Sequence, residues 1–414
     1  MKFLIQGVVM SKIFIIFIFS MLLNIQPIFS QTNNLNMSVG TAFNSKHLFS
    51  HNNNLRTSNK SNINFNLEYS KRNLTSQLSL NFDDYNRLSF DKSYINYEKG
   101  MANLSIGKVD RIWSFSKKSS LILSSNSRPL KTISLNLENK FNTNWLPLNS
   151  NWSVEIINSS TKNSFNGNNS ILTGARVIIR PSEQLNFEFI KTAQWGDQND
   201  KLYLPNINAL LPINTNVGKY ANMNKMAGFG LSYSIPFQEK VYHFYSQVIG
   251  EDEAGNLPSC YAWMAGLELT APMMKFPTTV SLEAIDTRVN ESTHGNCGTN
   301  TMYNNNTYNY TNYGTVLGVP IDTESTSLEL FGTSQINNNL SINYSTKFLS
   351  INDSNNMEHR LSSKRASGTV TSLGIYWKKN GFDFGGDISY QDLILNKASI
   401  SNDTVLSLFT SVEF

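Results

Sequence analysis

Two groups of charged residues in this sequence could do chemistry. The first is the acidic run Glu251, Asp252 and Glu253, which precedes a Gly turn. Carboxylates at this density could bind Ca²⁺ or serve as a general acid and base. The run offers too few oxygen ligands for calcium, and it lacks the Gly and acidic positions of an EF-hand loop. We therefore favour a third use, in which these carboxylates anchor a loop to basic residues such as Arg111 or Arg128.

The second group is Asp110, Arg111 and Trp113. An Arg fork beside an aromatic face could clamp the carboxylate of a uronic acid while the ring packs against a sugar. An internal ion pair is the alternative. We favour the ion pair, because a charged loop that folds back into the interior of a protein must pair its charges. Asn126 and Arg128, further along the same segment, complete this candidate ligand-binding set.

Aromatic and amide side chains provide further candidates for sugar binding. Gln194 and Trp195 form a pair that could hold a pyranose, but Trp195 could equally be an aromatic residue at a membrane interface. Four tyrosines in an Asn-rich segment could also stack on sugar rings, although a Tyr-rich loop is also typical of an interfacial rim. These are Tyr303, Tyr308, Tyr310 and Tyr313.

The sequence contains no pattern typical of an active site or a metal centre. Its five His residues are scattered, no Gly-x-Ser-x-Gly elbow occurs, and no Cys or His spacing suits zinc. A net charge of +4 spread over 414 residues does not indicate a nucleic-acid partner. We therefore expect a protein that is not an enzyme and that binds no cofactor, metal or nucleic acid.

β-Strands must position these residues, because apolar and polar side chains alternate with a period of two along the chain. The alternation is clear in residues 62–69, 77–83 and 132–138. A soluble β-sandwich would alternate in the same way, so the pattern alone does not identify the solvent. With 15% charged residues and a mean hydropathy of -0.29, the composition is compatible with a membrane barrel, whose strands are half polar.

The N-terminal end of the chain indicates export. Residues 1–30 are typical of a secretory signal peptide, because Lys12 precedes an apolar stretch and a polar chain begins near Gln31. Met10 is an alternative start to Met1. No later stretch is apolar for the roughly 18 residues that a spanning helix needs, so strands must hold the protein in any membrane.

The C-terminal end decides between the two kinds of β-protein. Residues 404–414 form an alternating strand that finishes on Phe414. Bacterial outer-membrane barrels commonly end in this way, whereas a soluble sandwich has no reason to end on an aromatic residue within a strand. We therefore predict that residues 31–414 form a barrel in the outer membrane of a Gram-negative cell.

Turn lengths predict the topology, because short periplasmic turns alternate with longer outer loops in such barrels. Counting back from Phe414 on the periplasmic side, tight turns fall near residues 378–381, 336–339, 271–275, 238–240, 181–184 and 71–73. Longer outer segments fall at 352–366, 288–322, 251–259, 195–225 and 110–129. The predicted fold is all-β, a transmembrane antiparallel β-barrel of about 18 strands, with most candidate residues in or beside the outer loops.

Five runs in the mature chain resemble, in the same order, the capsule assembly Wzi family of outer-membrane proteins. The resemblance covers most of the mature chain, and weaker matches follow at residues 283–287 and 308–318. The five runs are Gly107 to Trp113, Ser120 to Pro129, Thr192 to Gly196, Asn224 to Gly228 and Gly250 to Ser259.

This resemblance implies a barrel of 18 strands whose outer mouth is closed by loops, acting as a lectin that holds capsular polysaccharide at the cell surface. The chain departs from the family pattern in two outer loops. Residues 114–116 are Ser-Phe-Ser where Gly-Pro-Gly is usual, and Val319 and Pro320 stand where a His is common. The implied fold is unaffected, but the identity of the glycan is left open.

Cys260 and Cys297 are the only two cysteines of the chain, and export permits a disulfide bond between them. Both are predicted to lie at the outer end of the barrel. A bridge would pin the long Asn-rich loop over the mouth, while two free thiols are the alternative.

The leading hypothesis is a non-enzymatic surface lectin for capsular or extracellular polysaccharide. A diffusion channel is the second hypothesis, because a barrel of this size leaves an aqueous passage unless loops fill it. An outer-membrane hydrolase that uses the acidic run is the third and least favoured. The expected surroundings are outer-membrane lipid and lipopolysaccharide, and the barrel is expected to be a monomer.

Overall fold

The computed structural model describes residues 35–49, 61–83, 87–139, 151–162, 169–196, 210, 223–254, 257–290, 297–305 and 307–414. The expected signal peptide, residues 1–30, lies outside the described residues. Within the described part of the chain, no helix has the length and apolar character needed to cross a membrane.

Antiparallel strands build the part of the molecule that the structure describes. The strands of the wall are β1 (Leu35–Asn44), β2 (Ser61–Lys71), β3 (Leu74–Asp83), β4 (Leu88–Ser89), β5 (Tyr94–Lys99), β6 (Ala102–Lys108), β7 (Lys131–Glu138), β8 (Asn151–Lys162), β9 (Asn169–Arg180), β10 (Leu185–Trp195), β11 (Asn224–Phe237), β12 (Lys240–Ala254), β13 (Leu257–Met273), β14 (Phe276–Asp286), β17 (Thr326–Asn337), β18 (Leu340–Ile351), β19 (Ala366–Lys379), β20 (Phe382–Asp392) and β21 (Asp403–Glu413). A separate two-stranded ribbon consists of β15 (Thr311–Asn312) and β16 (Thr315–Val316).

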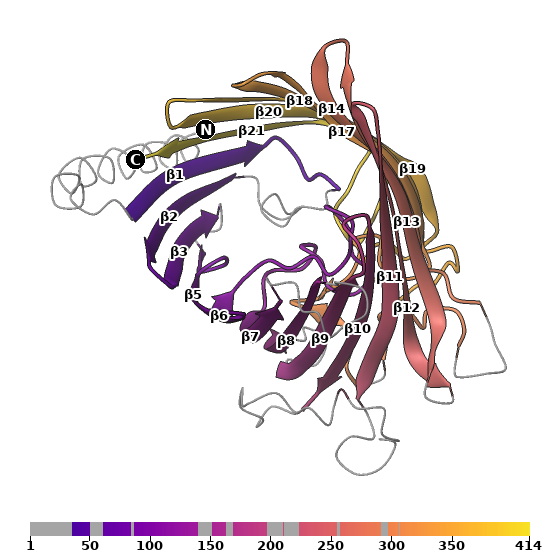
Figure 1. Ribbon diagram of the computed structural model, residues 1–414. Helices are drawn as coiled ribbons and strands as arrows, with labels where there is room; N and C mark the ends of the chain where they lie inside the picture. The colour runs from indigo at the N-terminus through magenta and orange to yellow at the C-terminus, as the bar shows by residue number, and fades with distance from the viewer. Residues whose placement is uncertain are drawn as a thin grey trace.

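The wall closes into a barrel, because neighbouring strands pair all the way round and β1 pairs with β21 (Figure 1). Val39 lies opposite Val412, and the backbone N–H of Phe414 donates to the Met37 carbonyl at 2.8 Å. The described residues form 19 strands in this sheet, of which β4 and β5 both pair with β3 and share one position. The predicted barrel of 18 strands is therefore confirmed.

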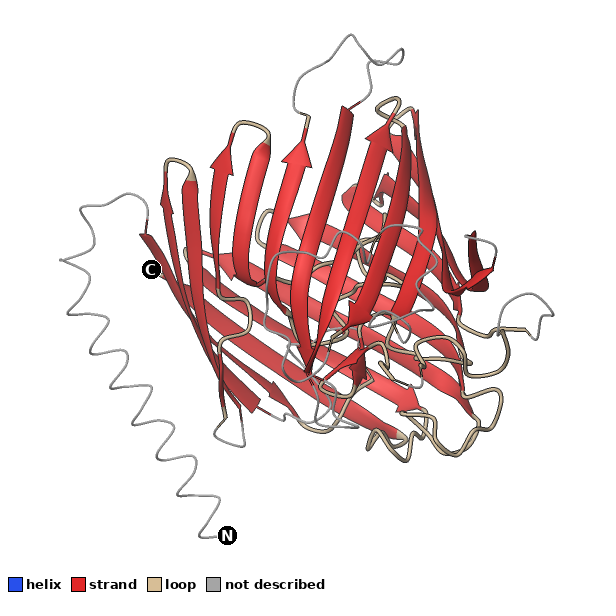
Figure 2. Ribbon diagram, turned by 90° about the horizontal axis from the view of Figure 1, so that it is seen from below, coloured by secondary structure: helices blue, strands red, loops and turns tan. Residues whose placement is uncertain are grey.

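Short turns lie at one end of the wall, which we call the turn end, and longer loops gather at the other, the loop end (Figure 2). The six predicted tight turns all fall at the turn end, each between consecutive strands. One predicted loop is wrong. Residues 251–259 are mostly strand, because β12 and β13 continue their ladder until Ala254 pairs with Leu257. The extra pairing satisfies backbone groups that a loop would leave to other partners.

The outer surface of the wall is apolar and the inner surface is polar, as the alternation predicted. In β21, Leu406 and Leu408 are 45% and 39% exposed, whereas Val405 and Ser407 are 0% and 3% exposed and face inward. The same pattern gives the outside of the barrel large exposed side chains such as Phe189, Phe229 and Leu282. An apolar outer band around a closed barrel is what a lipid bilayer requires.

Candidate functional site

The main hydrophobic core lies inside the barrel, where loops enter from the loop end. Residues 109–130, which connect β6 to β7 and are called the inner loop below, fold into the lumen (Figure 1). Leu121 and Ile122 are fully buried there, and Trp113 is 1% exposed. The indole packs against Gly174 of β9, where a Cβ atom would lie 3.0 Å from the ring. Glycine at this position lets a large aromatic ring lie flat against the wall.

Arg111 and Trp113 both bind one carboxylate of the wall, Glu155 of β8. Arg111 Nε donates to Glu155 Oε1 and Trp113 Nε1 donates to Glu155 Oε2, each at 2.8 Å. Asp110 forms an ion pair with Lys92 at 3.2 Å. The favoured interpretation of paired charges thus agrees with the geometry, although Arg111 pairs with Glu155 and not with Asp110. The buried Trp113 ring presents no face to a sugar.

The tip of the inner loop is held by carboxylates that point inward from β13, β14 and β17. Ser116 Oγ and Ser119 Oγ donate to the two oxygens of Glu283 at 2.6 and 2.5 Å. Lys117 Nζ donates to Glu268 at 2.7 Å. These contacts fix the loop across the lumen, because hydrogen bonds to carboxylates are stronger than those between neutral groups.

A second carboxylate bridge ties the same tip to β17 and β18. Lys118 Nζ donates to Glu329 Oε1, and Lys347 Nζ lies 3.3 Å from Glu329 Oε2. Glu329 and Lys347 have side chains only 4% and 6% exposed. The lumen at this level is therefore occupied by paired charges and packed side chains.

The connection from β14 to β17, residues 287–325, is the second loop and packs on the inner loop. Tyr303 and Tyr310 are fully buried, and Tyr303 Oη donates to the Leu121 carbonyl at 2.7 Å. Burial raises the pKa of the Tyr303 hydroxyl well above its ordinary value, so it stays a neutral donor. Of the four tyrosines considered for sugar stacking, these two belong to the core, whereas Tyr313 is 46% exposed.

Glu251 and the disulfide hold the second loop at the β12–β13 hairpin. Glu251 accepts hydrogen bonds from the backbone N–H of Tyr303 and, at 3.4 Å, from Asn224 Nδ2. Cys260 and Cys297 are joined by a disulfide with a Cα–Cα distance of 5.0 Å. Glu251 does anchor a loop, but through backbone and amide donors and not through Arg111 or Arg128. The side chains of Asp252 and Glu253 lie outside the described residues.

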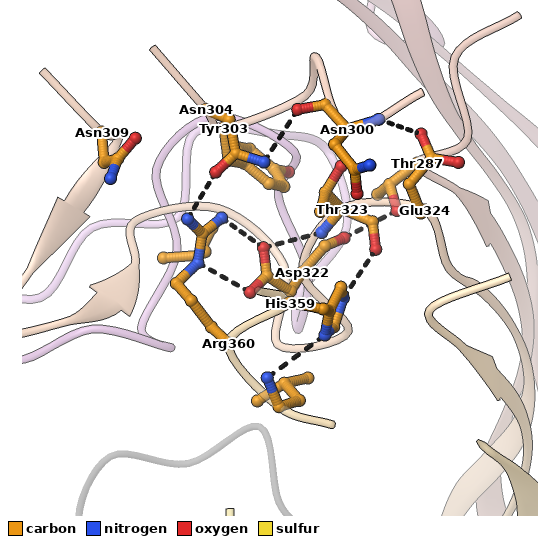
Figure 3. Close-up of polar contacts among 12 residues, drawn as sticks. Thr287, Asn300, Tyr303, Asn304, Asn309, Asp322, Thr323, Glu324, His359 and Arg360 are labelled. Atoms are coloured by element: carbon orange, nitrogen blue, oxygen red, sulfur yellow. Dashed lines mark hydrogen bonds and ion pairs between the residues drawn. The ribbon is translucent and has the colours of Figure 1, made fainter. Parts of the chain in front are cut away.

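Residues 352–365, the third loop, are bonded to the second loop. Arg360 donates to both carboxylate oxygens of Asp322, with Nε at 2.7 Å from Oδ2, and its Nη1 donates to Asn304 Oδ1 at 2.6 Å (Figure 3). His359 accepts from the Leu361 N–H at Nδ1, 3.2 Å, so its Nε2–H donates to the Thr323 carbonyl at 3.0 Å. We call the inner, second and third loops together the plug.

Sequence reasoning missed this charged cluster of Asp322, His359 and Arg360. The residues come from two loops separated by two strands, and no spacing in the sequence links them. Burial lowers the pKa of His359 below its ordinary value, and this outweighs the nearby Asp322 carboxylate. The imidazole is therefore a neutral structural group in the plug.

Three other predicted site residues support the wall or the plug. Gln194 is fully buried and donates to Ser170 Oγ at 2.8 Å, and Trp195 Nε1 donates to Thr173 Oγ1 at 3.0 Å. Asn126 Nδ2 donates to the Val316 carbonyl at 2.9 Å. Gln194 is therefore buried and is not accessible to a sugar at the mouth of the barrel. Across the described residues, no group of three or more His, Cys, Asp or Glu side chains is placed to hold a metal ion.

Arg128 differs from the other candidates because it borders a large cavity. This cavity, of about 820 Å³, lies in the lumen between the plug and the inner faces of β1, β2 and β3 on one side and of β19, β20 and β21 on the other. Arg128 Nε donates to Asp91 Oδ2 at 2.7 Å, and the guanidinium carbon lies 4.9 Å from the centre of the Tyr313 ring. Burial raises the pKa of Asp91, but hydrogen bonds from Arg128 and Lys108 outweigh it and hold the pKa below its ordinary value.

Comparisons with known proteins agree with this architecture. A family model described as capsule assembly protein Wzi matches residues 31–391. A Klebsiella pneumoniae protein described as an uncharacterized 55.8 kDa protein in the cps region is 26% identical over 193 residues. That match spans 46% of this chain and only 38% of the Klebsiella protein.

Solved structures show the same fold. The Escherichia coli outer-membrane protein Wzi, described as a carbohydrate-binding β-barrel involved in group 1 capsule assembly, matches with a TM-score of 0.76 at 19% identity. The match covers 91% of this chain and 84% of that one. Pseudomonas aeruginosa OccK2, solved in complex with glucuronate, matches with a TM-score of 0.54 at 10% identity over 92% of this chain and 97% of that one.

Proposed function

The chain belongs to the capsule assembly Wzi family, and from that premise we propose that it is a non-catalytic lectin of the outer membrane. It binds capsular or related extracellular polysaccharide and keeps the polymer attached at the cell surface. Residues 1–30 act as the signal peptide, the loop end faces the outside, and the barrel works as a monomer among outer-membrane lipid and lipopolysaccharide.

One observation carries this proposal: loops at the loop end are fixed to each other and to the wall. Glu155, Glu283 and Glu329 anchor the inner loop, and the Cys260–Cys297 disulfide anchors the second loop. A channel would gain nothing from this many anchors across its lumen. A lectin gains a rigid outer surface, since preordered loops lose less conformational entropy when a ligand binds.

Binding to a repeating polymer does not require one strong contact on each barrel. Each repeat of the polymer offers the same contacts, so weak contacts on many barrels add up through multivalency. Attachment then depends on the density of barrels and on the length of the polymer, and each single contact can remain weak and reversible.

Deletion of the gene tests the proposal. The mutant should release polysaccharide into the medium while total synthesis continues, and a plasmid copy should restore attachment. Polymer is measured in the cell-bound and released fractions by a uronic acid assay and by electrophoresis. If the cell-bound amount is the same with and without the gene, the lectin proposal fails.

A diffusion channel is the second candidate, favoured by the cavity of about 820 Å³ beside the plug. Planar bilayer recordings distinguish the two functions. Steady, large single-molecule conductance of the intact protein would favour the channel. We expect conductance to appear only after the inner loop is shortened, for example by replacing residues 114–122 with a short Gly-Ser segment.

A further inference from the structure

The lumen cavity has one wall built almost entirely from amide and hydroxyl groups. Asn66 Nδ2 donates to Ser38 Oγ at 3.3 Å and Asn66 Oδ1 accepts from Ser79 Oγ at 2.6 Å, while Asn81 Nδ2 lies 3.4 Å from Ser79 Oγ. This line crosses β1, β2 and β3 and borders the cavity throughout. We call it the amide ladder.

Asn64 extends the amide ladder with unused hydrogen-bonding capacity. It lies between Gly40 of β1 and Asn81 of β3 and also borders the cavity. Its side chain makes no hydrogen bond with any described residue. A Cβ atom on Gly40 would lie 2.7 Å from Asn64 Oδ1, so glycine leaves this amide the room to face the cavity. Amide groups of this kind can donate to and accept from sugar hydroxyls.

The plug side of the cavity has an excess of positive charge around Tyr313. Asp91 is shared by Lys108 Nζ and Arg128 Nε, both at 2.7 Å, so one carboxylate faces two cations. A third cation, Lys162, lies 5.4 Å from the Tyr313 ring centre, and its ammonium group forms no ion pair within the described residues. Two other cations border this side of the cavity, and each is paired, Arg87 with Asp83 and Lys92 with Asp110.

Arg128 and Tyr313 both have polar atoms that form no hydrogen bond with a described residue. Only Nε of the guanidinium is bonded to Asp91, and Nη1 and Nη2 donate to no described residue. The Tyr313 hydroxyl likewise has no hydrogen-bond partner among the described residues, and its ring is 46% exposed. A planar guanidinium edge with free N–H groups matches a carboxylate, and an exposed aromatic ring matches the apolar face of a sugar.

From these observations we propose that the lumen cavity is a binding site for an acidic oligosaccharide, with the carboxylate of a uronic acid on Arg128. The sugar ring lies against Tyr313, and hydroxyl groups of neighbouring sugars bond to Asn64 and the rest of the amide ladder. The volume is within the range of about 300–1,000 Å³ usual for ligand sites. The inference rests on the proposed lectin function and names the chemical class of polymer that it holds.

The clamp that the sequence suggested at Arg111 and Trp113 is thus assigned to a different pair. In the earlier candidate, Arg111 Nε and Trp113 Nε1 donate to Glu155, and the two other nitrogens of Arg111 donate to the Val109 carbonyl and to Ser134 Oγ. Arg128 and Tyr313 also combine a guanidinium with an aromatic ring, but they have free polar atoms at a cavity. Both pairs have the side chains needed to bind a carboxylate and a sugar ring, but only Arg128 and Tyr313 border the cavity.

Calorimetric titration of the full-length protein in detergent tests the site directly. The probes are a tetrasaccharide that alternates glucuronate with N-acetylglucosamine and the same tetrasaccharide with its carboxylates reduced to alcohols. We expect the acidic form to bind and the reduced form to bind at least tenfold more weakly, roughly the effect of losing one charge-assisted hydrogen-bonded pair. No binding of the acidic form, or equal binding of both, overturns the proposal.

Variants locate the site. Arg128→Gln should weaken binding of the acidic form about tenfold or more, and it leaves Asp91 paired with Lys108. Asn64→Leu should weaken both forms. Arg180→Gln, which removes one positive charge at the turn end, is the matched control and should bind like the wild type. Heat-dependent migration on gels checks that each barrel is folded. Undiminished binding in folded Arg128→Gln excludes the cavity.

An experiment in cells distinguishes this inference from the proposed function. If the gene deletion sheds polymer but Arg128→Gln retains it fully, the lectin function stands and the cavity site is rejected. If the deletion itself sheds nothing, the lectin proposal fails, whatever the titrations show. Acetate serves as a further probe. If acetate saturates the site at the concentration at which the acidic tetrasaccharide does, the site binds any small carboxylate, and its assignment to a sugar is wrong.

Discussion

Trp113 and Glu155 are joined by a hydrogen bond of 2.8 Å between the buried indole nitrogen and a carboxylate on the inner face of β8. The other oxygen of Glu155 accepts from Arg111, so one wall residue satisfies two side chains of the inner loop. This carboxylate is therefore the point at which the plug is fixed to the wall near the base of the inner loop.

Replacing Glu155 with Ala should loosen the inner loop, because it leaves the Arg111 guanidinium without its carboxylate. We expect a loss of about 2–4 kcal/mol in the stability of the plugged state, somewhat below the cost of breaking a fully buried pair. Trp113→Phe is the smaller comparison and should cost about 1 kcal/mol for the lost hydrogen bond. The rate of protease cleavage within residues 110–129 measures how much each variant loosens the inner loop. Equal cleavage rates in the two variants would contradict the expectation that Glu155→Ala has the larger effect.

Removing the disulfide should free the second loop without unfolding the barrel. A bridge across 37 residues is worth about 4 kcal/mol through the entropy of the opened chain. Cys260→Ser and Cys297→Ser should each raise the rate of proteolysis in residues 297–325 and lower the amount of cell-bound polymer. The double variant should match either single one. A greater effect in one single variant would point to a role for its thiol outside the bridge.

Acid should weaken the third loop through His359. The imidazole is neutral in the folded plug and its pKa lies below the ordinary 6.5, so its stabilising contribution is complete above pH 6.5. As pH falls below that value, the opened plug takes up a proton that the folded plug does not, and stability is lost at up to about 1.4 kcal/mol per pH unit. The charged groups that act on His359 are Asp322, Arg360 and Lys397.

Hydrogen exchange at residues 322–325 and 357–361, corrected for intrinsic rates, measures this effect between roughly pH 7.5 and pH 5. His359→Gln should exchange faster at neutral pH and should lose the acid-induced step. A step of the same size in this variant would assign the pH dependence to another group.

Glu329 is a further anchor, since it pairs with Lys118 and with the buried Lys347. Glu329→Gln leaves both ammonium groups without a carboxylate and should destabilise the barrel by about 3 kcal/mol. The double variant Glu329→Leu with Lys347→Met should recover most of this loss, because a matched apolar pair needs no desolvated charge. The temperature at which the folded form disappears on gels ranks the three proteins, and a double variant less stable than Glu329→Gln would contradict the reasoning.

The candidate site shows where sequence reasoning stopped. Charge and aromatic type singled out residues 110–129, but the ion pairs form with partners that the sequence did not indicate, because Glu155, Asp91 and Lys92 lie in other segments of the chain. The acidic run was assigned to an outer loop, residues 251–259, by counting turns back from Phe414. The strands instead continue through it, with Asp252 opposite Ser259. Local patterns cannot show which distant carboxylate will accept a given donor.

The sequence by itself determined the barrel, its strand number and the side on which each turn lies. Those features follow from a period-two alternation and from turn lengths, both of which are local properties of the chain. Only the tertiary structure decided which side chains are free. Arg111 and Arg128 are alike in the sequence, but all three nitrogens of the Arg111 guanidinium donate to Glu155, Val109 or Ser134. Only Nε of Arg128 is bonded, to Asp91, and this leaves the rest of its guanidinium free at the edge of the cavity. Closing the barrel creates that difference, because it brings strands from distant parts of the chain around one lumen.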